Sequence, residues 1–127
     1  MKRIDVYFLV LAAFALIVGV LLGITMAASH DFQLVPVHAH VNLVGWASLA
    51  LFGLTYRAYP QLKAGKLAVL HLVLGATAAV SLPLGIYLAV VRQSEGLAMV
   101  SSLLWLGAVL VFAAQTLRLF RLTATEA

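Results

Sequence analysis

Four long runs of apolar residues leave this chain very few possible folds. The runs cover about residues 6–28, 37–59, 67–91 and 97–119 of the 127-residue sequence. A helix that crosses a bilayer needs roughly 20 mainly apolar residues, and each run is long enough. Only 9% of the residues are charged, against roughly 25% in an ordinary soluble domain. The sequence therefore predicts an all-α integral membrane protein with four spanning helices.

The connections between the runs are short, at about residues 29–36, 60–66 and 92–96. Short connections make consecutive helices antiparallel neighbours. We therefore expect one domain over residues 1–127, an up-down-up-down four-helix bundle. The first run follows two basic residues, as in a secretory signal peptide. It is longer than the roughly 7–15 apolar residues of such a peptide, so we interpret it as the first membrane helix.

The basic residues gather on one side of the predicted bundle. Only Arg92 falls on the other side, and the remaining seven are Lys2, Arg3, Arg57, Lys63, Lys66, Arg118 and Arg121. Because cytoplasmic segments carry the excess of Lys and Arg, this distribution predicts both termini in the cytoplasm. We expect the membrane to be the inner (plasma) membrane of a bacterium or archaeon. No basic helix is available to bind a phosphate backbone, so we expect no nucleic-acid partner.

Four histidines are the main ligand-capable residues. His30, His38 and His40 are expected near the outer face, and His71 near the inner face. At 1.5 Å per helical residue the two levels are roughly 20 Å apart, so one chain cannot use His40 and His71 for the same metal ion. On a helix, His38 and His40 point about 200° apart, and Asn42 shares the face of His38.

Imidazole groups at a membrane helix suit several kinds of site. Neutral imidazole binds haem iron, copper and zinc. One interpretation is a copper or zinc site at the outer face, formed by His30, Asp31, His38 and His40, with His71 as the ligand of a second site on the inner side. The absence of cysteine excludes thiolate chemistry. Another interpretation is a cofactor-free structural or assembly subunit, whose histidines bond to backbone or water.

Residues 40–56 read His-Val-Asn-Leu-Val-Gly-Trp-Ala-Ser-Leu-Ala-Leu-Phe-Gly-Leu-Thr-Tyr, and Pro60 follows. This segment resembles the second helix of the catalytic subunit in the haem-copper oxidase superfamily, especially its nitric oxide reductase and cbb3-type branches. In that family the helix begins with a histidine that is an axial ligand of the low-spin haem, and an asparagine follows two residues later. The resemblance implies that His40 binds haem iron and that Asn42 takes the place of the asparagine. The chain has far fewer helices than that subunit and lacks its paired copper-binding histidines, so by itself it is not a complete oxidase or reductase.

The resemblance leads us to expect a small membrane b-type cytochrome for electron transfer, haem handling or gas sensing, with a redox protein or quinol as partner. Haem b is expected near the outer face, bound by His40, with His38 as the next candidate and Asn42 beside them. Two copies related by a two-fold axis can each supply one histidine to one iron, so we expect a homo-oligomer. Arg92, at the outer level, is the expected partner of the haem propionates.

Overall fold

The computed structural model describes residues 3–123, which contain helices and no strand. The helices are α1 (Ile4–Ser29), α2 (Val35–His40), η1 (Val41–Ser48), α3 (Leu49–Ala58), η2 (Pro60–Lys63), α4 (Lys66–Arg92) and α5 (Gly96–Thr123). Since α2, η1 and α3 follow one another without a break, the chain has four helices long and apolar enough to cross a membrane. The prediction of four helices of sufficient length and apolarity to span a membrane is confirmed within the described residues, and each end lies within two residues of the expected one. Lys2 lies outside the described residues, and the side chain of Arg121 is not described.

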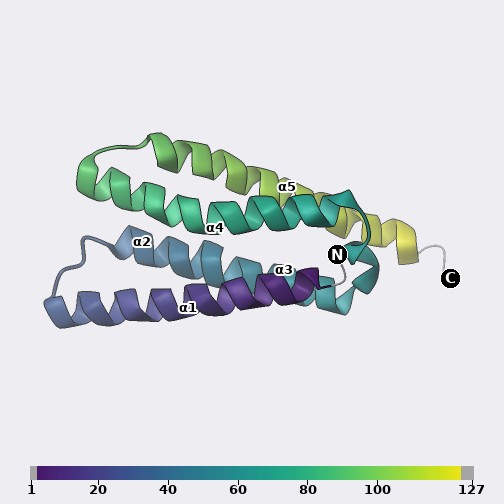
Figure 1. Ribbon diagram of the computed structural model, residues 1–127, viewed down its shortest axis with the longest axis horizontal. Helices are drawn as coiled ribbons and strands as arrows, with labels where there is room; N and C mark the ends of the chain where they lie inside the picture. The colour runs from purple at the N-terminus through teal and green to yellow at the C-terminus, as the bar shows by residue number, and fades with distance from the viewer. Residues whose placement is uncertain (1–2, 124–127) are drawn as a thin grey trace.

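The helices lie side by side in two pairs. Figure 1 shows α1 alongside α2 and α3, and α4 alongside α5, with the chain reversing direction at each connection. The start of α1 and the end of α5 lie toward the same end of the bundle (Figure 1). Outward-facing side chains are largely apolar, as at Phe14, Leu103 and Phe120. Such a surface is rare on a soluble monomer and suits contact with lipid tails.

The second helix contains a wide turn that the sequence did not predict. Residues Val41–Ser48 form a π-helix of eight residues, immediately after His40. Two side chains add hydrogen bonds to carbonyls of this part of the helix. Asn42 Nδ2 donates to the carbonyl of His38 (2.8 Å), and Ser48 Oγ donates to that of Leu43 (2.7 Å). π-Helical turns are rare, and many of those known lie at functional sites.

Glycines allow α1 to approach the second helix closely. A Cβ atom built on Gly19 would lie 2.5 Å from Oδ1 of Asn42, and one on Gly23 would lie 3.2 Å from Cε1 of His38. In a bilayer, small residues let helix backbones come together and so favour packing. The spacing Gly-x-x-x-Gly of α1 thus makes room for the two polar side chains at the start of the second helix.

The buried hydrophobic cluster of the core lies where the start of α1 meets α3, η2 and α4. Its buried members are Ile4, Phe8, Ala12, Leu49, Phe52, Tyr56, Leu62 and Ala68. Beside this cluster, the buried carboxylate of Asp5 forms an ion pair with Lys63 Nζ at 3.0 Å, and Arg57 Nη1 lies 3.9 Å away. The ion pairs tie the first turn of α1 to the connection between α3 and α4.

The backbone of α4 approaches that of α5 closely at Gly85, and this contact can be tested against a matched glycine. A Cβ on Gly85 would lie 2.5 Å from the backbone nitrogen of Ala98, whereas one on Gly107 of α5 would lie 3.5 Å from Leu74. By helix propensity alone, replacing either glycine with alanine should stabilise its helix by roughly 1 kcal/mol. We expect Gly85→Ala to lower the midpoint temperature of unfolding in detergent, since overpacking costs about 1–3 kcal/mol. Gly107→Ala should leave the midpoint unchanged or raise it, and equal midpoints for the two variants would contradict this contact.

Candidate functional site

The three histidines expected at the outer face have three different environments. His30 is exposed and follows α1 with a left-handed backbone (φ 53°). Next to it, Asp31 accepts a hydrogen bond from the backbone N–H of Gln33 at 3.0 Å. Both residues therefore belong to the exposed connection between α1 and α2. His38 and His40 lie on α2 itself.

His38 links the second helix to α1. Its Nδ1 lies 3.0 Å from the carbonyl oxygen of Gly19, and because a carbonyl only accepts, Nδ1 is the donor. The amide of Asn42 lies 3.5 Å from the other ring nitrogen, Nε2. The prediction that His38 and Asn42 share one face is confirmed, and this face is turned toward α1. Nδ1 of His38 is therefore engaged by α1, and the Asn42 amide nitrogen, which donates to the His38 carbonyl at 2.8 Å, lies almost equally far from the two ring nitrogens, at 3.4 and 3.5 Å.

His40 has one ring nitrogen bonded and one free. Its Nδ1 donates to the carbonyl oxygen of Pro36, one turn earlier, at 2.8 Å. In the neutral imidazole Nε2 then has a lone pair, and no described residue is hydrogen bonded to it. The side chain is partly exposed. Of the two histidines on α2, His40 is the one whose imidazole is oriented and available to an external ligand.

Within residues 3–123, no three His, Cys, Asp or Glu side chains form a group that could hold a metal ion. The structure does not bring His30, Asp31, His38 and His40 together as copper or zinc ligands within one copy. A site with several protein ligands to one metal therefore has no geometric support here.

His71 lies at the other end of the bundle, in a buried polar chain. Tyr56 places its hydroxyl oxygen 3.0 Å from Nδ1 of His71. The same oxygen accepts from the amide of Gln115 at 3.3 Å, and the tautomer of His71 determines which group donates in the bond between Tyr56 and His71. Gln115 also donates to the carbonyl of Leu62 (3.1 Å) and accepts from Arg118 (2.7 Å). These bonds connect α3, η2, α4 and α5.

Aromatic rings enclose His71 on several sides. The ring centroids of Phe8, Phe52 and Phe112 lie 5.0, 4.5 and 5.6 Å from that of His71. The residue is fully buried, and its Nε2 has no hydrogen-bond partner among the described residues. Phe8 and Gly19 are eleven residues apart on α1, about 16 Å along the helix. His71 and His38 therefore occupy separate levels, as expected.

The sequence reasoning did not single out Tyr56 and Gln115 as partners of His71. A signal was present, because a glutamine or histidine inside an apolar span is costly unless it is hydrogen bonded. The spacing along the chain does not show which helices bring these side chains together. In the folded bundle, Gln115 of α5 reaches Tyr56 of α3, which in turn bonds to His71 of α4.

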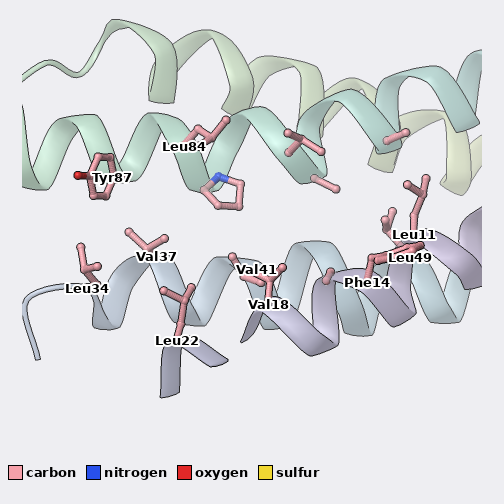
Figure 2. A pocket seen from close by; sticks show the side chains of 15 residues that line it. Leu11, Phe14, Val18, Leu22, Leu34, Val37, Val41, Leu49, Leu84 and Tyr87 are labelled. Carbon is pink, nitrogen blue, oxygen red and sulfur yellow. The ribbon is translucent and has the colours of Figure 1, made fainter. Parts of the chain in front are cut away.

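A cavity of about 450 Å³ lies between α1, the α2–η1 part of the second helix and α4. Figure 2 shows Leu34 and Tyr87 at one end of it and Leu11 and Leu49 at the other. None of the four histidines lines this cavity. The cavity is thus separate from both histidine environments.

Arg92 ends α4 and is exposed, and it forms no ion pair with a described residue. Along the bundle axis, Leu84 of α4 lies between Val37 and Val41 of the second helix (Figure 2). His40 is in the helical turn between those two valines. Arg92 is eight residues beyond Leu84, about 12 Å further along α4. The structure does not bring Arg92 beside His40.

No protein-family model, curated protein or solved structure matches this chain. The likeness of residues 40–56 to a haem-binding helix therefore depends on that segment alone.

The bond between Tyr56 and His71 can be tested with a change that keeps the ring. Tyr56→Phe removes the hydroxyl, which leaves Nδ1 of His71 buried without a partner. Loss of a partner for a buried polar group costs about 1–3 kcal/mol, so we expect a lower unfolding midpoint in detergent. Tyr59→Phe is the control, because Tyr59 is exposed and its hydroxyl makes no hydrogen bond to a described residue. If the two variants unfold alike, the buried bond contributes nothing to stability.

Proposed function

We propose that this chain is a small b-type cytochrome-like membrane protein that binds haem b through Nε2 of His40. The observation that carries the proposal is the 2.8 Å hydrogen bond from Nδ1 of His40 to the carbonyl of Pro36. It supports the tautomer whose Nε2 has a lone pair. Histidines that bind metals almost always donate the other ring N–H in this way. The resemblance of residues 40–56 to the second helix of haem-copper oxidase catalytic subunits is the reason that we propose haem as the group.

The surroundings of His40 favour a haem held between two copies of the chain. Of the two histidines on α2, His40 supplies a ring nitrogen without a partner in its own copy, whereas Nδ1 of His38 is bonded to the carbonyl of Gly19. Leu43, one turn after His40, is 64% exposed. This apolar surface suits the face of a haem and a second copy. Two copies related by a two-fold axis place two His40 side chains on one iron.

The chain's own residues bind and orient the group in this proposal. Pro36 fixes the imidazole of His40, and the α1–α2 contact at His38 holds the helix that carries it. Arg92 is left outside the proposed haem site because of its distance along α4. When bound, the haem supplies an iron that exchanges one electron or binds a small gas molecule. The roles that follow are electron transfer with a redox protein or quinol, haem handling, or gas sensing.

The orientation in the membrane is also part of the proposal. Arg57, Lys63 and Lys66 lie near the connection between α3 and α4, at the end where α1 begins, and Arg92 lies at the opposite end. By the positive-inside rule, the first end faces the cytoplasm. His40 then lies toward the outer face of a bacterial or archaeal inner membrane.

The test is an absorption spectrum of the detergent-purified protein after titration with haemin, oxidised and then reduced with dithionite. We expect a Soret band and sharp reduced α and β bands in the wild type. His40→Ala should lose them, because the ligand atom is gone. His30→Ala is the matched control and should keep them, since His30 is exposed in the connection. A wild type that binds no haemin, or an unchanged spectrum in His40→Ala, would overturn the proposal.

The two-copy arrangement predicts a stoichiometry. Haem titration monitored at the Soret band should saturate at one haem for two chains, and the loaded protein should have the mass of a dimer. A mixed dimer of wild type and His40→Ala has one ligand, so its iron should become high-spin. Saturation at one low-spin haem per monomer would instead require the second ligand from the same chain.

A further inference from the structure

His71 helps to join the two pairs of helices near the end of the bundle where α1 begins. It lies on α4, and its Nδ1 is 3.0 Å from the hydroxyl oxygen of Tyr56 on α3. The same oxygen accepts a hydrogen bond from Gln115 on α5 at 3.3 Å. Figure 1 shows α3 in one pair and α4 and α5 in the other. Two hydrogen bonds between the pairs therefore meet at one hydroxyl group.

The hydrogen bonds around this hydroxyl group suit the neutral form of His71. Gln115 also donates to the carbonyl of Leu62 and accepts from Arg118, so the orientation of its amide is fixed, with the nitrogen toward Tyr56. A neutral imidazole can accept the hydroxyl proton of Tyr56 at Nδ1, whereas a protonated imidazole donates from both nitrogens. The Tyr56 oxygen would then receive two donors, and its own proton would have no acceptor among the described residues.

The second ring nitrogen of His71 also disfavours a proton in the closed bundle. Nε2 is buried and has no hydrogen-bond partner within residues 3–123. The rings of Phe8, Phe52 and Phe112 lie around the imidazole, from α1, α3 and α5. A charge in such an apolar interior is costly unless it is paired and hydrogen bonded. A protonated His71 would meet neither condition here.

The charges around His71 supply no counterion. No ion pair of the described residues includes His71, and the carboxylate of Asp5 is paired with Lys63 at 3.0 Å. Among titratable side chains, only imidazole has an ordinary pKa that changes its charge between pH 5 and 8. The described titratable and charged groups at this end are Arg3 and Asp5 on α1, Tyr56 and Arg57 on α3, Lys63 on η2, Lys66 on α4 and Arg118 on α5.

We propose that His71 is an acid-sensitive latch between the two helix pairs. The neutral ring and Tyr56 hold the pairs together at this end, and a proton on the ring separates them, because water then solvates the charge. A ring in contact with water titrates near its ordinary pKa of about 6.5. One proton is bound on opening, so the ratio of open to closed molecules is about 30-fold higher at pH 5 than at pH 8. The latch is independent of the haem proposal, because His71 and His40 occupy different levels.

The test is pulsed EPR spectroscopy of the full-length protein in lipid nanodiscs, with one nitroxide label on each helix pair. The chain contains no cysteine, so labels can be attached at Leu54→Cys on α3 and Leu117→Cys on α5, two exposed positions. We expect one distance at pH 8 and a second, longer distance at pH 5. Labels at the opposite end, at the exposed Ile24→Cys and Val100→Cys, should give one distance at both pH values.

Two histidine substitutions assign the opening to His71. His71→Asn keeps an amide beside Tyr56 and removes the titratable ring, so it should keep a single distance at pH 5. His30→Asn, in the exposed connection, is the matched control and should open as the wild type does. Should His71→Asn fail to fold, His71→Phe makes the same comparison. A single distance in the wild type at pH 5, the same opening in His71→Asn, or equal opening at both ends of the bundle would overturn the proposal.

Discussion

The close approach of α1 to the second helix at Gly19 and Gly23 determines much of the remaining structure. Lipid tails are as apolar as the helices, so helix association in a bilayer depends on close packing and polar contacts rather than on burial from water. The two glycines permit both the close packing and the polar contacts, because the space beside them is occupied by His38 and Asn42. With these side chains directed at α1, the rotation of the second helix is set, and His40 falls outside the contact.

Two clusters of hydrogen-bonded side chains lie at different levels of the bundle. His38 and Asn42 join α1 to the second helix near one end, and Tyr56, His71 and Gln115 join α3, α4 and α5 near the other. A polar group buried in an apolar interior costs free energy unless it is hydrogen bonded. Both clusters therefore specify which helices are neighbours more sharply than the apolar contacts do. The cavity between α1, the second helix and α4 extends toward the first end, where fewer such contacts join the α1–α2 pair to α4.

The π-helical stretch lies in the second helix between His38, in the first cluster, and Tyr56, in the second cluster. It begins directly after His40, and its first polar residue, Asn42, bonds back to the carbonyl of His38. Ser48, at its end, bonds to the carbonyl of Leu43. These side-chain bonds satisfy backbone acceptors in a region where no water is available. The wide turn thereby keeps His38 toward α1 while the aromatic residues of α3 remain directed at the core.

The sequence by itself determined the fold class, because runs of apolar residues this long have few stable alternatives to membrane helices. It also determined the separation of His71 from the outer histidines and the shared face of His38 and Asn42, since both follow from helix periodicity. Only the tertiary structure decided that Nδ1 of His38 is bonded to α1 while Nε2 of His40 has no partner. It also decided that Tyr56 bonds to His71 and Gln115 to Tyr56, and that a cavity lies beside α4. These features depend on contacts between residues far apart in the chain, and helix periodicity contains no information about which faces meet.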